Sequence, residues 1–301
     1  MSGASDDVIR VGILGPGLMG APMARNIRAA GHEVTVWARR PEAVAALATD
    51  GIASAETPAA LAAASDVVIS MLPDLPQLEP LLDGPDGVYA GADGSVVLVV
   101  ASTVSPAGVR DFGARVAEAS SGAIAVIDAP VSGGEKGAIA GELSLMVGGD
   151  ESAVATAWPV LSACGTPTHL GAIGAGSVVK AANQLIVGAE VAALSEASLL
   201  ARDAGIELST LFDVLSRGLA SSEVLNQKRA RLTEADYTVS GAARFMAKDL
   251  RFVLEAAGST GTPAPLATFL RGQYEGLNEA GLGDLDIIVM QKYVDEHLRS
   301  K

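Results

Sequence analysis

The sequence predicts an α/β fold, in which a doubly wound Rossmann-type domain is followed by an all-α domain, and one long helix joins the two. Three observations predict it. Short β-branched runs alternate with helical segments over the first half, a glycine-rich turn follows the first run, and helical patterns dominate after about residue 165. With 301 residues, 49% of them hydrophobic, the chain can bury the cores of two domains.

The first half predicts a mainly parallel sheet with helices on both faces, because each predicted strand is separated from the next by a helical or turn segment. The predicted helices include 19–30, which Gly31 ends, and 41–48, which Pro41 begins. The predicted strands are 8–14, 33–37, 67–71, 96–100, 123–127 and, as the final one, 143–147.

The second half predicts helices only. The glycine-rich segment 171–176 reads as a flexible hinge, and a long helical pattern then runs over about 177–204. Shorter helices are predicted at 209–217, 222–232, 245–257, 265–280 and 284–298. We therefore place a dinucleotide-binding domain at 1–167 and an all-helical substrate and oligomerisation domain at 168–301.

Composition and charge exclude several classes of function. The net charge of −14 disfavours binding to nucleic acid or to anionic membranes, which need clustered basic residues. The three histidines are scattered without metal-ligand spacing, so we expect no metal, and a single cysteine, Cys164, fits a reducing compartment. The polar segment 1–7 is unlike a signal peptide, and polar residues interrupt the apolar stretch 181–200. We expect a cytoplasmic protein.

The strongest local motif is Gly15-Pro16-Gly17-Leu18-Met19-Gly20, which lies between the first predicted strand and a helix. In a dinucleotide site the first glycine makes the tight turn, the second lets the pyrophosphate approach the backbone, and the third allows close helix–strand packing. A glycine-rich strand–helix turn without a ligand is the alternative.

The end of the second strand bears on the choice of cofactor. An NAD site usually has an acidic residue there to bind the ribose 2′-hydroxyl, but this chain has Arg39 and Arg40 and no acid. Two guanidinium groups suit a 2′-phosphate, so we expect NADP rather than NAD. Alternatively, both arginines are solvated loop residues.

Three further stretches carry polar residues in specific patterns. The first is Asp128-Ala129-Pro130-Val131-Ser132-Gly133-Gly134. The second places Lys180, Asn183 and Gln184 at i, i+3 and i+4, hence on one face of the long helix. The third is Lys248-Asp249-Leu250.

Together with 15–26, Met71-Leu72-Pro73 and Ser102-Thr103, these stretches resemble the β-hydroxyacid dehydrogenase family over nearly the whole chain. The resemblance implies hydride transfer between a nicotinamide cofactor and a small β-hydroxyacid or its semialdehyde. It also implies that Lys180 is the general acid and base. By itself, a surface lysine on an interdomain helix is an equal reading.

The resemblance assigns the other site residues as well. Asn183 orients Lys180 and the substrate oxygens, Gln184 contributes to the choice of substrate, and Lys248 closes over the cofactor. The substrate carboxylate is assigned to Ser132, Gly133 and Gly134, whose backbone N–H groups can form an anion-binding nest. The nicotinamide side of the cleft is assigned to Met71, Leu72, Pro73 and Thr103. The alternative for 132–134 is an ordinary Ser-Gly-Gly loop. The alternative for 248–249 is a Lys-Asp pair on the surface.

The choice of substrate is open within the family. The Asn183-Gln184 pair and the stretch 218–222 resemble the tartronate semialdehyde (2-hydroxy-3-oxopropionate) reductases, although Ser221 stands where those have glycine. Enzymes of 3-hydroxyisobutyrate, sulfolactaldehyde, threonate or succinic semialdehyde are alternatives, as are an imine reductase, which Lys180 disfavours, and a non-catalytic dinucleotide-binding protein. Val100 and Ala38 depart from the Asp and Asn common in the family. We expect a homodimer or homotetramer.

Overall fold

The computed structural model describes residues 8–299, so the polar segment 1–7 lies outside the described residues. The chain divides into two compact units, residues 1–180 and 181–301. Helix α9 (Ala175–Asp203) contributes to both units and begins two residues before its predicted start. The domain boundary placed between residues 167 and 168 stays a prediction.

The first unit contains a six-stranded sheet in which every pairing is parallel. Its strands lie in the order β3-β2-β1-β4-β5-β6. They are β1 (Arg10–Leu14), β2 (Glu33–Trp37), β3 (Ala53–Ser54), β4 (Val67–Ser70), β5 (Val96–Val100) and β6 (Ile124–Asp128). The strand order reverses between β1 and β4, which defines a switch point at the carboxyl ends of these strands. The predicted doubly wound fold is confirmed.

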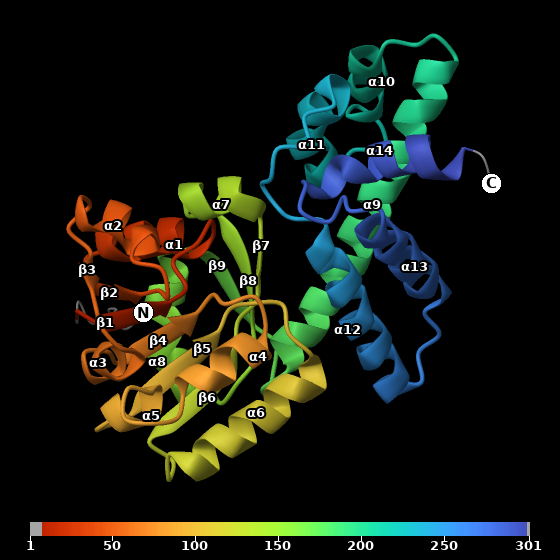
Figure 1. The fold of residues 1–301 in the computed structure, drawn as a ribbon. Coiled ribbons are helices and arrows are strands. Elements are labelled where there is room, and N and C mark those ends of the chain that lie inside the picture. Colours follow the sequence, from red (N-terminus) through yellow and green to blue (C-terminus); the bar gives the residue numbers. More distant parts are fainter. Residues whose placement is uncertain (1–7, 300–301) are drawn as a thin grey trace, which may run out of the picture. The chain divides into compact units, whose positions relative to one another are not determined.

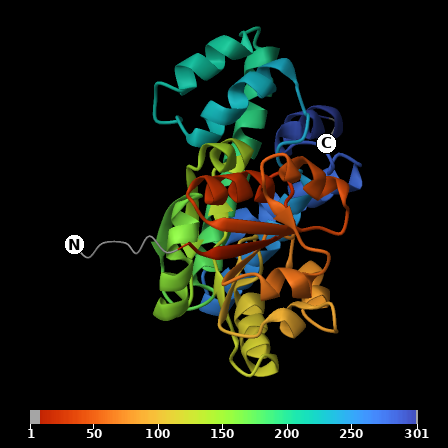
Figure 2. The same ribbon diagram turned by 90° about the vertical axis from the view of Figure 1, so that its left-hand side faces the viewer.

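Successive residues of the central strands point to opposite faces of this sheet, and each face has its own core. Val67 and Ile69 belong to the core that α1 (Gly20–Ala29) and α8 (Glu151–Ser162) cover, whereas Val68 belongs to the core of α3 (Pro58–Ala63) and α6 (Pro106–Ala119). Figures 1 and 2 both show α1 and α6 on opposite sides of the sheet. The remaining helices of the sheet region are α2 (Glu42–Ala48), α4 (Leu75–Leu78), the short 3-10 helix η1 (Glu79–Leu81) and α5 (Val88–Gly91).

A second, three-stranded sheet contradicts the prediction that 143–147 is the final strand. It contains β7 (Val131–Ser132), β8 (Leu143–Val147) and β9 (Gly165–His169), with α7 (Gly134–Ala140) between β7 and β8. β7 pairs antiparallel with β8, and β9 pairs parallel with it. The sequence signal for β9 is weak because its residues, GTPTH, are partly or fully exposed and form no apolar run.

The helical unit confirms most of the predicted helices. α10 (Leu208–Leu215), α11 (Glu223–Glu234), α12 (Arg244–Thr260) and α13 (Pro265–Glu279) all lie within three residues of their predicted bounds. The core that α9, α12 and α13 share includes the fully buried Tyr274, whose hydroxyl donates to the Gly188 carbonyl oxygen of α9 at 3.2 Å.

The predicted last helix, 284–298, begins only at Ile287 and then runs without a gap through η2 (Ile287–Val289), α14 (Met290–Tyr293) and the π-helical η3 (Val294–Leu298). Asp286 gives the physical reason. Its fully buried carboxylate accepts the backbone N–H of Ile288 and forms an ion pair with Lys228 at 2.9 Å, so the helix can begin only after it.

Among residues 8–299, α9 is the one helix that is long and apolar enough to cross a membrane by length and composition. Core helices of soluble proteins pass the same test, so this is weak evidence for a membrane span. The helix also contains the buried polar residues Ser177, Lys180, Ser195 and Ser198.

Candidate active site

The turn after β1 is shaped by its glycines. Gly15 has a φ of +85°, and its N–H donates to the Trp37 carbonyl oxygen at 3.0 Å. A Cβ on Gly20 would lie 2.6 Å from the Gly15 carbonyl oxygen, so only glycine lets α1 begin this close to the turn. A Cβ on Gly17 would meet no atom within 4 Å. Packing within the protein therefore does not require glycine at position 17. A ligand that approaches the backbone closely would require it.

The helix that follows suits an anionic ligand. α1 has no acidic residue in its first turn, so the positive end of its dipole is not neutralised locally. In the turn itself Pro16 is buried, Met19 is partly buried and Leu18 is 52% exposed. These features fit the pyrophosphate of a dinucleotide.

At the end of β2, Arg39 and Arg40 are both exposed. Neither forms a salt bridge or side-chain hydrogen bond with any residue in the described range 8–299. The next acidic side chain along the chain, Glu42, lies in the first turn of α2. The guanidinium groups therefore remain accessible to a solute phosphate.

The segments after β4 and β5 are joined to each other and to the glycine turn. The Leu72 side chain lies beside Gly15, whose added Cβ would come within 2.9 Å of Leu72 Cδ2. The Ser102 hydroxyl donates a short hydrogen bond to the Leu72 carbonyl oxygen. Pro73 is exposed and Thr103 is partly buried. The first unit thus brings the predicted residues 71–73 and 103 to the carboxyl edge of the sheet.

The Ser132–Gly134 stretch contains two successive glycines in unusual backbone conformations. Gly133 and Gly134 have φ values of +134° and +66°, a conformation that side-chain-bearing residues rarely adopt. Ser132 pairs with Ser144 of β8, and α7 begins at Gly134. The side chain of Asn26 donates to the Ala138 carbonyl oxygen at 2.7 Å, which ties α7 to α1.

Asp128, at the end of β6, binds the beginning of α9. Its fully buried carboxylate accepts the N–H of Gly174 at 2.7 Å and both the N–H and the hydroxyl of Ser177, at 2.6 and 2.8 Å. Burial raises the pKa of Asp128, and these hydrogen bonds oppose the rise. Within the predicted hinge, Gly174 is thus buried and bound by Asp128, whereas Gly171 and Ala172 are exposed. Lys180 follows Ser177 by three residues and is only 7% exposed.

The helical unit brings together three predicted site residues and one that was not predicted. Nδ2 of Asn183 donates to Oε1 of Gln184 at 3.0 Å, and Nε2 of Gln184 donates to Oδ2 of Asp249 at 2.5 Å. Nζ of Lys248 lies 3.1 Å from Oδ1 of Asp249 and 4.9 Å from the Phe252 ring centroid. Because α9 is continuous, Lys180 shares a helical face with Asn183 and Gln184.

Comparison with known proteins decides the family. Residues 10–179 match the NAD binding domain of 6-phosphogluconate dehydrogenase, and residues 174–294 match the NAD-binding region of NADP-dependent 3-hydroxyisobutyrate dehydrogenase. The chain is 34% identical over 286 residues to 2-(hydroxymethyl)glutarate dehydrogenase of Eubacterium barkeri, covering 94% of each protein. It is 36% identical over 250 residues to 2-hydroxy-3-oxopropionate reductase of Escherichia coli strain K12, covering 83% of this chain and 84% of that protein.

The chain belongs to the β-hydroxyacid dehydrogenase family. Among solved structures, 3-hydroxyisobutyrate dehydrogenase from Salmonella typhimurium matches with a TM-score of 0.86 at 31% identity, covering 94% of this chain and 98% of that one. As a β-hydroxyacid dehydrogenase, the chain is an NAD(P)-dependent oxidoreductase that acts on small carboxylate-bearing substrates.

Two buried carboxylates of this β-hydroxyacid dehydrogenase had no predicted role. Asp128 and Asp249 both lie inside motifs that the sequence singles out, but their partners are 46 and 65 residues away along the chain. Only the folded structure shows that Asp128 binds the start of α9 and that Asp249 binds Gln184.

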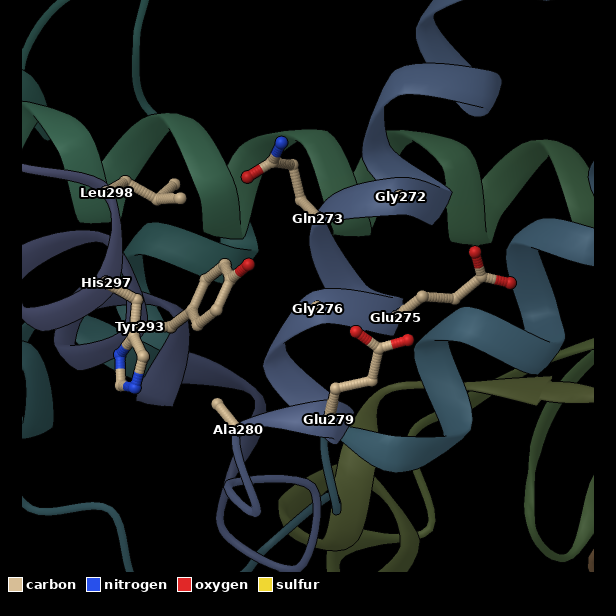
Figure 3. A pocket seen from close by; sticks show the side chains of 9 residues that line it. All are labelled: Gly272, Gln273, Glu275, Gly276, Glu279, Ala280, Tyr293, His297 and Leu298. Carbon is tan, nitrogen blue, oxygen red and sulfur yellow. The ribbon is translucent and has the colours of Figure 1, made fainter. Parts of the chain in front are cut away.

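A pocket in the helical unit of this dehydrogenase contains none of the predicted site residues. It lies along α13 and the C-terminal helical segment, as Figure 3 shows. Glu275, Glu279, Tyr293 and His297 are among its lining residues. Among residues 8–299, no group of three or more His, Cys, Asp or Glu side chains could hold a metal ion.

Proposed function

We propose that this β-hydroxyacid dehydrogenase interconverts tartronate semialdehyde and glycerate. The observation that carries the proposal is the Asn183–Gln184 pair on the helical face of Lys180, with its amide groups hydrogen-bonded to each other and to Asp249. Amides in this position can bind the hydroxyl and carbonyl oxygens of a small hydroxyacid. The named relative with 36% identity, a 2-hydroxy-3-oxopropionate reductase, supports the same substrate.

Recognition of the substrate carboxylate is assigned to the Ser132–Gly134 stretch. The two glycines support this role, because a stretch without side chains at these positions lets an anion come close to the backbone. The Ser132 hydroxyl supplies a further polar group.

Lys180 is assigned as general acid and base. A bound nicotinamide supplies the hydride in the reductive direction and accepts it in the oxidative one. In the reductive direction the Lys180 ammonium polarises the substrate carbonyl and donates a proton to its oxygen. In the oxidative direction the neutral amine takes the hydroxyl proton. Asn183 orients Lys180 and the substrate oxygens.

We infer that NADP is preferred to NAD and that Lys248 closes over the cofactor. Arg39 and Arg40 support NADP, because both guanidinium groups are exposed at the end of β2, where an NAD site has an acid. A glycine turn that leaves space beside Gly17 fits the dinucleotide common to both cofactors.

The chain is further proposed to be a cytoplasmic homodimer or homotetramer. Support for the oligomer comes from large apolar side chains that the single chain leaves exposed on and near its helices. They include Ile186 at 59%, Leu200 at 74% and Val214 at 65% exposure. Burial of such residues against a second copy would stabilise the assembly.

The deciding experiment is a panel of semialdehyde acids and β-hydroxyacids, followed by cofactor absorbance with NADPH and NADH. We expect tartronate semialdehyde to have the highest kcat/KM, and its neutral methyl ester to be a poor substrate because the carboxylate-binding donors would lose their partner. A clear preference for the oxidation of 3-hydroxyisobutyrate would overturn the substrate. Equal efficiency for acid and ester would remove the carboxylate from recognition.

A further inference from the structure

We propose that Asp249 is a positioning residue that fixes the orientation of the Gln184 amide and thereby makes the enzyme prefer a hydroxyl over a methyl group at C2 of the substrate. The inference rests on the proposed function, because it concerns the substrate that is proposed to bind at the face of α9 that contains Lys180.

The orientation follows from the hydrogen-bonding capacity of the three groups. A carboxylate only accepts, so the amide of Gln184 must direct Nε2 toward Oδ2 of Asp249. Its Oε1 then faces Asn183, whose Nδ2 donates to it at 3.0 Å. If the Gln184 amide were flipped, an oxygen would face the carboxylate and two NH₂ groups would face each other. The hydrogen bonds therefore all run in one direction, with Asn183 donating to Gln184 and Gln184 donating to Asp249.

Burial makes this orientation strict. Asp249 is 5% exposed, so water cannot readily replace a lost partner. Its second oxygen, Oδ1, forms no hydrogen bond but lies 3.1 Å from Nζ of Lys248, as an ion pair. One carboxylate thus holds Gln184 and Lys248, which belong to different helices.

The consequence is one N–H of Gln184 that Asp249 does not bind. Each amide NH₂ has two hydrogens, and Asp249 accepts only one from Gln184. The other N–H of Gln184 has no acceptor among residues 8–299 and can donate to a substrate oxygen. A C2 hydroxyl can accept this hydrogen bond, whereas a C2 methyl group would leave the donor without a partner. Such a site discriminates strongly against an analogue that lacks the hydroxyl.

The test uses two substrates that differ only at C2, namely 2-hydroxy-3-oxopropionate and 2-methyl-3-oxopropionate. The measured quantity is the ratio of their kcat/KM values. In Asp249→Asn the amide at 249 can donate as well as accept, so the orientation of Gln184 is no longer fixed. We expect the preference for the hydroxyl substrate to fall by roughly tenfold or more, the cost of one lost hydrogen bond of about 1.4 kcal/mol.

A second variant and a control separate positioning from general damage. Gln184→Met should lower the same ratio, and adding Asp249→Asn to it should lower the ratio no further, because Asp249 acts through Gln184. Asp286→Asn also changes a buried carboxylate paired with a lysine, but it should leave the ratio unchanged whatever it does to stability.

The outcomes distinguish this inference from the proposed function. No turnover of either substrate by the wild-type enzyme would overturn the proposed function. Wild-type turnover with an unchanged substrate ratio in Asp249→Asn would overturn the role of Asp249. The role would also be overturned if adding Asp249→Asn to Gln184→Met lowered the kcat/KM ratio by as much again as Asp249→Asn does in the wild-type enzyme.

Discussion

Substitution of Gly17 by alanine tests whether the turn after β1 is built for a ligand. An added Cβ meets no protein atom within 4 Å. We therefore expect the unfolding free energy to change by no more than about 1 kcal/mol, and to increase, because alanine lowers the conformational entropy of the unfolded chain. If a pyrophosphate occupies that space, the methyl group overpacks it at a cost of about 1–3 kcal/mol. That range corresponds to a roughly five- to 150-fold weaker cofactor Kd.

Two comparison variants make the measurement specific. Gly94→Ala adds a Cβ that also meets nothing within 4 Å, so we expect its stability to change within the same limit and its cofactor affinity to stay unchanged. Gly20→Ala would place its Cβ 2.6 Å from the Gly15 carbonyl oxygen, so it should destabilise the fold itself. Urea unfolding without cofactor and calorimetric titration with NADPH measure the two effects. Wild-type NADPH affinity in a folded Gly17→Ala protein would refute the reasoning.

Three further predictions follow from single features. Replacing Arg39 and Arg40 with Asp and Ser should raise the KM for NADPH far more than that for NADH, and a strong wild-type preference for NADH would show that the arginines are not ligands. Burial raises the pKa of the Cys164 thiol to about 12, so iodoacetamide should label it at pH 8 only after unfolding, and rapid labelling of native protein would contradict this. Asp128→Asn should cost about 1–3 kcal/mol in urea unfolding, because its NH₂ must face a buried N–H of Gly174 or Ser177, and unchanged stability would contradict that bond set.

The fold was predictable where apolar residues repeat with a clear period. The β-branched runs of β1, β4 and β5 and the apolar stripes of α12 and α13 are local signals, and the structure confirms them. β9 was missed because exposed Thr and His residues flank its Pro167, and pairing with β8, rather than an apolar run, defines it. The last helix was predicted to begin at residue 284 rather than 287, because nothing in the local sequence shows that Asp286 is buried beside Lys228.

Some features of the candidate site were likewise predictable from the sequence, and others were not. The glycine turn and the helical face of Lys180 follow from spacing along the chain, whereas the anion-binding nest at Gly133 and Gly134 stays a prediction. The hydrogen bonds of Asp128 and Asp249 join elements far apart in sequence, and no local pattern names their partners. Long-range contacts of this kind decide how the site residues are held.

The most direct test of the account is the activity of Lys180→Met. Methionine nearly preserves the volume of this 7% exposed side chain but cannot carry a proton. We predict that kcat falls by about 10²–10⁴-fold in both directions while the Kd for NADPH, measured by titration on the folded variant, stays within about twofold of wild type. Turnover near the wild-type rate by the folded variant would contradict the assignment of Lys180 as the general acid and base.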